Sequence, residues 1–272
     1  MTQISEDRAP KFLYKYYPAL VGQQRLYSER LFVHGEIYFS SPLDFNDPFD
    51  CRAYRYLALP ILQRSIPQWT LTDLHKTNPN LTEEQKQQHQ YDNLNFDKTS
   101  GPLIGAMDDD EISKLIGDFR IFCLSANREN ILMWSHYSSG HKGFCLEFKN
   151  ISESILGPAY QVEYPPDNKY PLVTFFEEEK AKERVKKMFL SKTNLWVYEQ
   201  EWRIFDLNKD DSIRHLSQII LSGVIFGCMM SDKDKKQIID WVKEGKFNPR
   251  FYQAKKKNDE FGLDIISLEE HS

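Results

Sequence analysis

The sequence has few of the features that mark membrane, secreted or zinc-stapled proteins. No apolar run approaches the roughly 18 residues that a membrane-spanning helix needs, and the first residues, MTQISEDRAPKF, hold no apolar stretch typical of a secretory signal. The four cysteines form no CxxC pair; they are Cys51, Cys123, Cys145 and Cys228. We therefore expect neither a disulfide framework nor a metal site, no membrane partner, and a reducing, cytoplasmic location.

Excess basic charge and a glycine-rich phosphate loop are also missing. The chain has 272 residues, with 35 Lys and Arg against 40 Asp and Glu, so its net charge is −5. Sequence-indifferent nucleic-acid binding needs a basic surface, and this balance argues against it. No glycine-rich loop follows a strand-like segment, which argues against Rossmann and P-loop folds. Aromatic residues are abundant instead, at 14% of the chain, and such rings can line a pocket as well as fill a core.

The hydrophobic patterns predict an α+β fold. Strands are predicted at residues 11–17, 36–40, 119–125, 142–148, 159–164, 201–205, 223–226 and 263–266, with one more near Phe251. Helices are predicted after Pro18, from Asn127, within residues 175–190 and after Ser231. Because strands outnumber βαβ units, we expect a mixed, largely antiparallel, split sheet flanked by helices, in a single domain over residues 1–272. The polar residues 66–118 are predicted to form a helical insertion or lid.

The strongest local signal for chemistry is the segment YEQEWR. On an extended strand, Glu199, Glu201 and Arg203 project to one face. Two carboxylates on one face repel each other unless a cation compensates, and Arg203 can do so; a surface Glu–Arg ladder is the alternative interpretation. Three large rings crowd the same segment, namely Trp196, Tyr198 and Trp202. Paired acids among rings suit a site where one acid orients a substrate hydroxyl and the other stabilises a developing cation.

A second signal is the loop FSSPLDFNDPFD. Ser40 and Ser41 end a predicted strand, and Asn46 and Asp47 offer further hydrogen-bonding groups. All of these are also ordinary turn residues. Two phenylalanines flank the turn and would hold it in place, as a preorganised binding loop requires.

Two further segments carry candidate residues. In MWSHY, His136 can act as an acid, a base or a hydrogen-bond donor, although a lone histidine of this kind is more often a core residue. No second His or Cys stands at a metal-ligand spacing from it. In LYKYY, one lysine lies among rings, so the strand is either an edge protected by its charge or one that presents Lys15 or Tyr16 to an anionic substrate.

The segments LYKY, FNDPF, MWSHY, KGF and EWR, in this order over residues 12–205, resemble a large bacterial family of unknown function. More distantly, the layout is similar to the ADP-ribosyltransferase superfamily, including the DarT-like toxins. The resemblance places Tyr14-Lys15-Tyr16 at the first motif of that superfamily, Ser40-Ser41 at the second and Glu199-Gln200-Glu201 at the third. The first motif departs from the superfamily, where His or Arg is usual.

This resemblance implies an enzyme that uses NAD as a substrate. Glu201 would bond the ribose hydroxyl as positive charge develops on the sugar, and Glu199 would orient or deprotonate the acceptor. Nicotinamide would stack on Tyr16, Trp134 or Tyr137. The NAD-binding residues implied in this way are Tyr14, Lys15, Tyr16, Ser40, Ser41, Asn46, Asp47, Trp134, His136, Tyr137 and Arg203.

Three functions follow as hypotheses. The first is an ADP-ribosyltransferase that modifies a protein or nucleic acid, in the role of a toxin or phage-defence effector. The second is a metal-dependent nuclease, in which Asp47, Asp50, Glu199 and Glu201 bind Mg²⁺ and Lys192 assists. The third is a non-catalytic module whose aromatic groove binds a peptide or a nucleotide. The sequence makes no prediction of the oligomeric state.

Overall fold

The computed structural model describes residues 9–57, 103–106, 109–149, 151–154, 156–174, 186–206 and 211–268. The chain divides into two compact units. We call Met1–Cys51, Ile112–Lys169 and Phe189–Ser272 the sheet unit, and Arg52–Glu111 with Tyr170–Met188 the small unit. The single domain and the insertion over residues 66–118 stay predictions, since residues 58–102 lie outside the described ranges.

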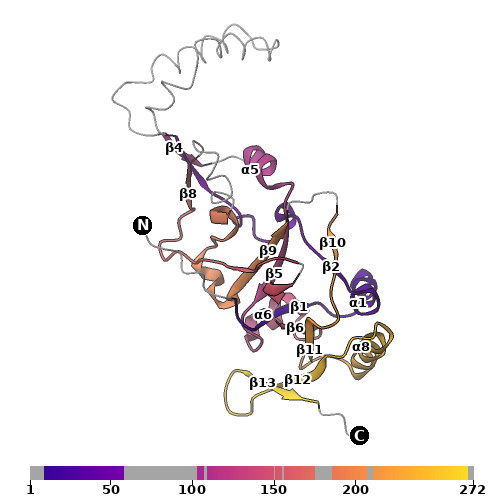
Figure 1. The fold of residues 1–272 in the computed structure, drawn as a ribbon. Coiled ribbons are helices and arrows are strands. Elements are labelled where there is room, and N and C mark those ends of the chain that lie inside the picture. The colour runs from indigo at the N-terminus through magenta and orange to yellow at the C-terminus, as the bar shows by residue number, and fades with distance from the viewer. Residues whose placement is uncertain are drawn as a thin grey trace, which may run out of the picture. The chain divides into compact units, whose positions relative to one another are not determined.

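The sheet unit is built on an eight-stranded sheet in the order β13-β12-β11-β6-β1-β5-β9-β7 (Figure 1). Its strands in chain order are β1 (Phe12–Tyr17), β5 (Arg120–Ser125), β6 (Phe144–Lys149), β7 (Tyr160–Gln161), β9 (Glu201–Asp206), β11 (Leu221–Phe226), β12 (Arg250–Lys256) and β13 (Leu263–Ser267). Every neighbouring pair is antiparallel except β11 and β12, which are parallel. The predicted α+β fold with a mixed, largely antiparallel sheet is therefore confirmed.

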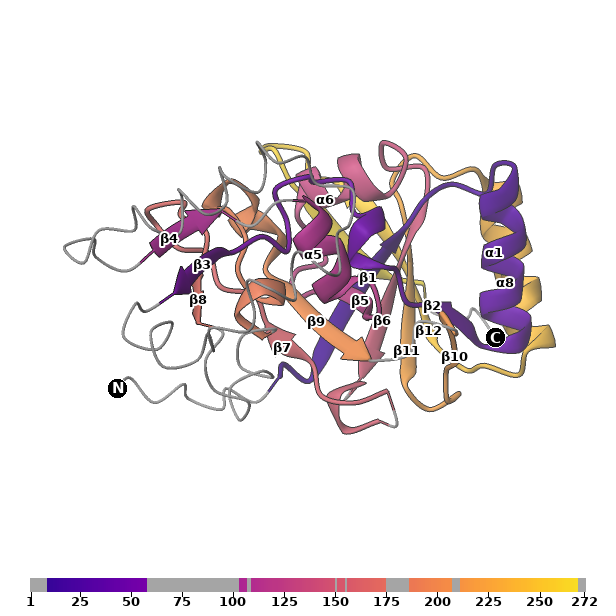
Figure 2. The same cartoon turned by 90° about the horizontal axis from the view of Figure 1, so that it is seen from above.

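Helices cover both faces of this sheet. Helices α1 (Gln23–His34) and α8 (Asp232–Glu244) contact each other and run side by side (Figure 2). Phe32 of α1 and Trp241 of α8 join the larger apolar core with Leu13 of β1. Helix α6 (Ile131–Tyr137) lies against the opposite face, where Trp134 packs with Tyr16 in a second apolar cluster. The alternation along β1 thus supplies both cores, as a strand buried on two faces requires.

Local capping decides where the helices begin and end. α1 ends at Gly35, whose left-handed backbone, with φ 70°, is the conformation that glycine adopts without a steric penalty. α8 begins after Ser231, whose hydroxyl accepts a hydrogen bond from the backbone N–H of Asp234. The helix predicted from Asn127 starts later, at Ile131, because Asn130 is the residue that caps it. Asn127 instead forms a turn, in which its side chain accepts from the N–H of Glu129.

The remaining elements are short. In the sheet unit they are β2 (Glu36–Tyr38), which pairs with β10 (Ile213–His215), and the 3₁₀ helices η1 (Pro42–Asp44), η2 (Ile151–Glu153) and η4 (Asn194–Glu199). The small unit contains a three-stranded sheet of β4 (Leu103–Ala106), β3 (Tyr54–Leu57) and β8 (Leu172–Thr174), and α5 (Asp109–Ile116) begins in it. Of the helix predicted within residues 175–190, only residues 186–190 are described, and residues 186–189 are helical.

Two sequence expectations concern the chain as a whole. None of the helices within the described ranges has the length and hydrophobicity needed to cross a membrane. All four cysteines lie in described segments, and all are free thiols.

Candidate active site

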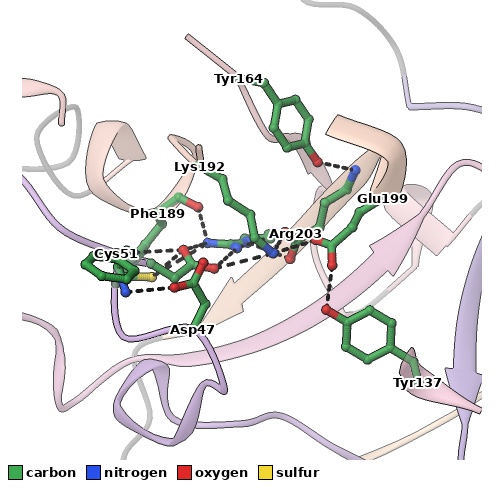
Figure 3. Close-up of polar contacts among 11 residues, drawn as sticks. Asp47, Cys51, Tyr137, Tyr164, Phe189, Lys192, Glu199 and Arg203 are labelled. Atoms are coloured by element: carbon green, nitrogen blue, oxygen red, sulfur yellow. Dashed lines mark hydrogen bonds and ion pairs between the residues drawn. The ribbon is translucent and has the colours of Figure 1, made fainter. Parts of the chain in front are cut away.

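Five buried charged side chains meet beside the start of β9 (Figure 3). We call them the charge cluster; they are Asp50, Lys192, Glu199, Glu201 and Arg203. Each side chain is between 0% and 8% exposed. Because a buried charge is costly unless it is paired, such a group persists only when its members neutralise one another.

Arg203 is the fully buried centre of the cluster. Its Nη1 and Nη2 donate to Oδ1 and Oδ2 of Asp50 at 3.0 and 2.7 Å, which is a bidentate pair. Its Nε and Nη2 donate to Oε1 and Oε2 of Glu201 at 2.8 and 2.9 Å. Nη1 also donates to the carbonyl oxygen of Phe189 at 2.7 Å. Arg203 therefore holds together Asp50 and Glu201, two acids that lie 151 positions apart in the chain.

Lys192 connects the acids to one another. Its Nζ lies 2.5 Å from Oε2 of Glu199, 3.1 Å from Oε2 of Glu201 and 3.6 Å from Oδ2 of Asp50. Burial alone would lower the pKa of this ammonium, but the three acids raise it above its usual value. Lys192 therefore keeps its proton and its positive charge.

Glu199 and Glu201 reach the same ammonium by a route that differs from the predicted strand. Glu199 is the last residue of the 3₁₀ helix η4, and Glu201 is the first residue of β9. Between them Gln200 has a left-handed backbone, with φ 45° and ψ 52°. The prediction that both acids lie on one extended strand is therefore wrong. The tight turn at Gln200 nevertheless brings both carboxylates to Lys192.

The pKa values of the two glutamates are shifted in opposite directions. Burial raises the pKa of Glu199 above its usual value, although Lys192 opposes this. Burial would also raise the pKa of Glu201, but Arg203 and Lys192 outweigh it and lower that pKa to about 2. The cluster holds three acids and two bases, so it carries one excess negative charge when all groups are ionised. A proton on Glu199 removes this excess.

Two tyrosines bound the cluster. The hydroxyl of Tyr137 donates to Oε1 of Glu199 at 2.5 Å, and the hydroxyl of Tyr164 accepts from the backbone N–H of Glu201 at 2.9 Å (Figure 3). Burial and then the Glu199 charge raise the pKa of Tyr137, so the phenol keeps its proton. Tyr137 is half-buried while Glu199 is buried. Tyr137 is therefore the less buried member of the hydrogen-bonded pair that it forms with Glu199.

An aromatic surface continues from this phenol. His136 is exposed, and its ring centroid lies 6.3 Å from that of Tyr137, 6.2 Å from that of Trp196 and 6.2 Å from that of Tyr198. Trp196 and Tyr198 are half-buried and lie 5.8 Å apart. Helix α6 and η4, which carry these rings, also contact each other. The structure thus brings together the predicted residues Glu199, Glu201, Arg203, His136 and Tyr137.

Other predicted residues are parts of the core. Trp134 is fully buried, packs edge-on against Tyr16 at 5.1 Å, and donates from its indole N–H to the carbonyl of Arg128 at 2.9 Å. The hydroxyl of Tyr16 donates to the carbonyl of Asn127 at 2.8 Å. Neither ring can stack on a ligand in this arrangement, so their predicted role in nicotinamide stacking is wrong. Tyr14 is buried as well, in the same apolar cluster as these rings.

Lys15 and Ser40 lie where the sheet forks, that is, where β1 separates from β5 and Ser40 takes its place beside β5. β1 pairs with β5 at Ser125, whereas Ser40 bridges the other end of the same β5 edge at Ile121. Between these points the Nζ of Lys15 donates to the carbonyl of Cys123 at 2.9 Å. Burial lowers the pKa of Lys15. The lysine therefore satisfies a carbonyl at the split between strands, which gives its presence a structural reason.

The loop after Ser40 delivers a residue that the first hypothesis did not name. Ser41 caps η1 by accepting from the N–H of Leu43, and Asp47 accepts from the N–H of Phe49 at 2.9 Å. Asn46 is exposed. Asp50, at the end of this loop, is the residue that joins the charge cluster.

The sequence interpretation gave three site residues too little weight. Asp50 and Lys192 entered only the nuclease hypothesis, and Tyr164 was not singled out. Only the structure shows that Arg203 is fully buried and that Asp50 pairs with the edge that Glu201 leaves open. No local pattern in the sequence identifies Asp50 as that partner.

The nuclease hypothesis finds little support in this geometry. Asp50 and Glu201 are bound by Arg203, while Glu199 and Glu201 are bound by Lys192. A divalent cation would have to displace these two cations or lie beside them. In the part of the chain that the structure describes, no group of three or more His, Cys, Asp or Glu residues is arranged to hold a metal ion.

The comparisons with known proteins add one finding. Residues 133–204 match the model of a family described as "Protein of unknown function (DUF2971)". The match contains the MWSHY, KGF and EWR segments and four members of the charge cluster, whereas LYKY, FNDPF and Asp50 lie outside it. No curated protein and no solved structure matches the chain. These comparisons support a resemblance to a family of unknown function, and nothing in them links the chain to ADP-ribosyltransferases.

Proposed function

We propose that the sheet unit is an enzyme that breaks the nicotinamide–ribose bond of NAD and transfers ADP-ribose to a macromolecular acceptor. The observation that supports this proposal is the split pair of acids, in which Glu201 stays ionised and Glu199 has a raised pKa. Two neighbouring carboxyl groups whose environments push their pKa values apart are typical of acid–base sites.

The reaction uses one carboxylate that stays ionised and a second that takes up a proton. As the bond breaks, nicotinamide leaves with the bonding electron pair and positive charge builds on the ribose carbon. A fixed anion in a buried site stabilises that charge without reorganising. The acceptor then forms a new bond to the ribose carbon and loses a proton. A base with a raised pKa takes up that proton more readily than an ordinary carboxylate does.

Tyr137 extends the base toward the substrate. The acceptor passes its proton to the phenol oxygen of Tyr137, while the phenol passes its own proton to Oε1 of Glu199. This transfer also removes the excess negative charge of the cluster, which favours it. Glu199 and Tyr137 are thus the catalytic residues that we propose.

Glu201 acts in a different way from the one that the superfamily resemblance implies. Both of its oxygens already accept hydrogen bonds from Arg203, and Oε2 also contacts Lys192. The side chain is only 6% exposed, so a ribose hydroxyl has little access to either oxygen. We therefore assign Glu201 an electrostatic, positioning role and give the contact with the substrate to the Tyr137–Glu199 end. The half-buried rings of Trp196 and Tyr198 offer a stacking surface for the nicotinamide or adenine ring.

A direct test incubates the full chain with NAD. Nicotinamide release is followed by liquid chromatography and NAD binding by calorimetry. Glu199→Gln should reduce turnover by at least about 100-fold, because general-base catalysis contributes this much, while NAD still binds. Since glutamine resembles the protonated acid, the variant should also keep its fold. Glu244→Gln, a change at an exposed acid of α8, serves as the matched control and should behave as wild type.

The variant Tyr137→Phe tests the role of the Tyr137 hydroxyl separately from that of Glu199. It removes only the hydroxyl that donates to Glu199, so turnover should fall while the thermal unfolding midpoint changes by only a few degrees. A wild-type chain that neither binds nor cleaves NAD would refute the proposed donor. Full turnover in Glu199→Gln would refute the proposed base.

A further inference from the structure

A second buried acid lies on the same face of the sheet as Glu201. Strand register places Glu147 opposite Tyr14, Tyr14 opposite Ser125, and Ser125 opposite Glu201. Directly opposed residues of antiparallel strands share a face, so these four side chains form one polar row across β6, β1, β5 and β9. Three strand spacings of about 4.8 Å separate its two ends, or about 14 Å.

Glu147 is held by three donors. Its side chain is 6% exposed. Oε1 accepts from the hydroxyl of Ser222 at 2.9 Å, and Oε2 accepts from Nη1 of Arg128 at 3.1 Å and, at the longer distance of 3.4 Å, from the hydroxyl of Tyr14. Gly223 lies opposite Glu147, and a side chain there would begin 3.2 Å from Oε1 of Glu147 and 3.0 Å from the ring of Tyr252. The absence of that side chain leaves room for both the Tyr252 ring and the Glu147 carboxylate.

Arg128 is fixed by these neighbours but remains accessible. Its guanidinium lies 6.0 Å from the ring centre of Tyr14 and 5.7 Å from that of Tyr252, within cation–π range of both. Its side chain is 30% exposed. Nη1 bonds to Glu147, whereas Nε lies 3.8 Å from Glu129, beyond hydrogen-bonding distance. Its other N–H donors have no hydrogen-bond partner among the residues that the structure describes.

A guanidinium held from behind by a buried acid and flanked by two rings is suited to bind an oxyanion. Its fork of donors matches the oxygens of a phosphate, and fixing the side chain beforehand lowers the entropy cost of binding. An ion pair that served only stability would gain little from a buried carboxylate, because desolvation offsets the attraction.

We propose that Arg128 binds the pyrophosphate of the nucleotide substrate, with Glu147 as its positioning residue. This inference rests on the proposed function, in which the ribose carbon reacts at Tyr137 and Glu199. Glu147, which holds Arg128, and Glu201, which lies beside Glu199, stand at the two ends of the polar row. An extended dinucleotide can span the distance between these ends. Arg128 is then the residue that distinguishes a nucleotide diphosphate from a nucleoside.

The test measures binding of pyrophosphate, ADP, NAD and adenosine to the full chain by calorimetry. Wild type should bind pyrophosphate, ADP and NAD, and should bind adenosine much more weakly. Because removing Arg128 alone would leave Glu147 buried without its counterion, the main variant is the double change Arg128→Met with Glu147→Gln. It should weaken ADP binding at least about tenfold, as the loss of a charged hydrogen-bonding partner does. Arg128→Lys, which keeps the charge but loses the fork, should give an intermediate loss.

Arg30→Met is the matched control, since Arg30 is an exposed arginine that also pairs with an acid but lies on α1, at the opposite face of the sheet. It should leave ADP binding unchanged. The inference is overturned if the double variant binds ADP like wild type, if wild type binds neither ADP nor pyrophosphate, or if adenosine binds as tightly as ADP. Pyrophosphate binding that depends on Arg128 without any NAD cleavage would refute the proposed function and leave this site standing. NAD cleavage that is unaffected in the double variant would do the reverse.

Discussion

At the scale of single residues, the central feature is a buried group of three acids and two bases. Arg203 is fully buried and binds two of the acids, and Lys192 binds all three. Such a group contributes less to stability than its contacts suggest, because each charge loses its hydration. Losing a single member of the cluster is nevertheless costly, because the remaining charges then stay buried without a partner.

Arg203→Met should therefore lower the free energy of unfolding by about 3–5 kcal/mol, the range for a buried pair that loses one partner. The loss arises because Asp50 and Glu201 would remain buried without their counterion. Urea denaturation measures it. Arg30→Met breaks an exposed pair with Glu36 instead, where water already screens the two charges, and its cost should be much smaller. Equal costs for the two variants would contradict this description of the cluster.

The low pKa of Glu201 also predicts how stability depends on pH. A carboxyl group with a pKa of about 2 in the folded chain and about 4.3 in the unfolded chain stabilises the fold fully above the unfolded value. That contribution is lost as the pH falls toward 2. The stability advantage of wild type over Glu201→Gln should hence be constant near neutral pH and shrink between about pH 4.3 and 2. An advantage that is unchanged at pH 3 would be inconsistent with this pKa.

At the scale of elements, the junction between η4 and β9 creates the site. A continuous strand would have aligned Glu199 and Glu201 along one face, as the sequence predicted. Instead, Thr193 caps η4 through its hydroxyl, and Gln200 turns the chain through a left-handed conformation. This turn lets Glu199 face Tyr137 while Glu201 faces Arg203.

Substitutions at Gln200 test this junction. A left-handed backbone costs most residues about 1–2 kcal/mol, and glycine adopts it without that penalty. Gln200→Gly should therefore be neutral or stabilising, whereas Gln200→Val should destabilise the chain, since a β-branched residue tolerates the conformation poorly. Thermal unfolding of both variants measures the difference. Equal unfolding midpoints would mean that the junction is not held in this conformation.

The sequence predicted most elements of the sheet unit but not all of their boundaries. The strands predicted at 11–17, 119–125 and 201–205 correspond to β1, β5 and β9, because each is a short run rich in aromatic and other apolar residues. The 3₁₀ character of η4 was missed, because Trp196 and Tyr198 favour strands on local propensity. Contacts with α6 override that propensity here.

At the scale of the whole molecule, the order of the strands lay beyond what the sequence could predict. β1 lies between β5 and β6, and the fork at Lys15 depends on Ser40 returning to β5. These contacts join residues that are far apart in the chain, so no local pattern reports them. For the same reason, the sequence could place Glu199, Glu201 and Arg203 together but could not recognise Asp50 as their partner, or Trp134 and Tyr16 as core.

The measurement that tests the split pair most directly is a titration of the glutamate side-chain carbons by ¹³C NMR. Spectra of Glu199→Gln and Glu201→Gln assign the two signals. The structure predicts that the Glu199 carboxyl titrates above the range usual for glutamate and that the Glu201 carboxyl remains ionised down to about pH 2. If both signals titrate together within the usual range, the two acids are equivalent, and the acid–base site proposed here does not exist.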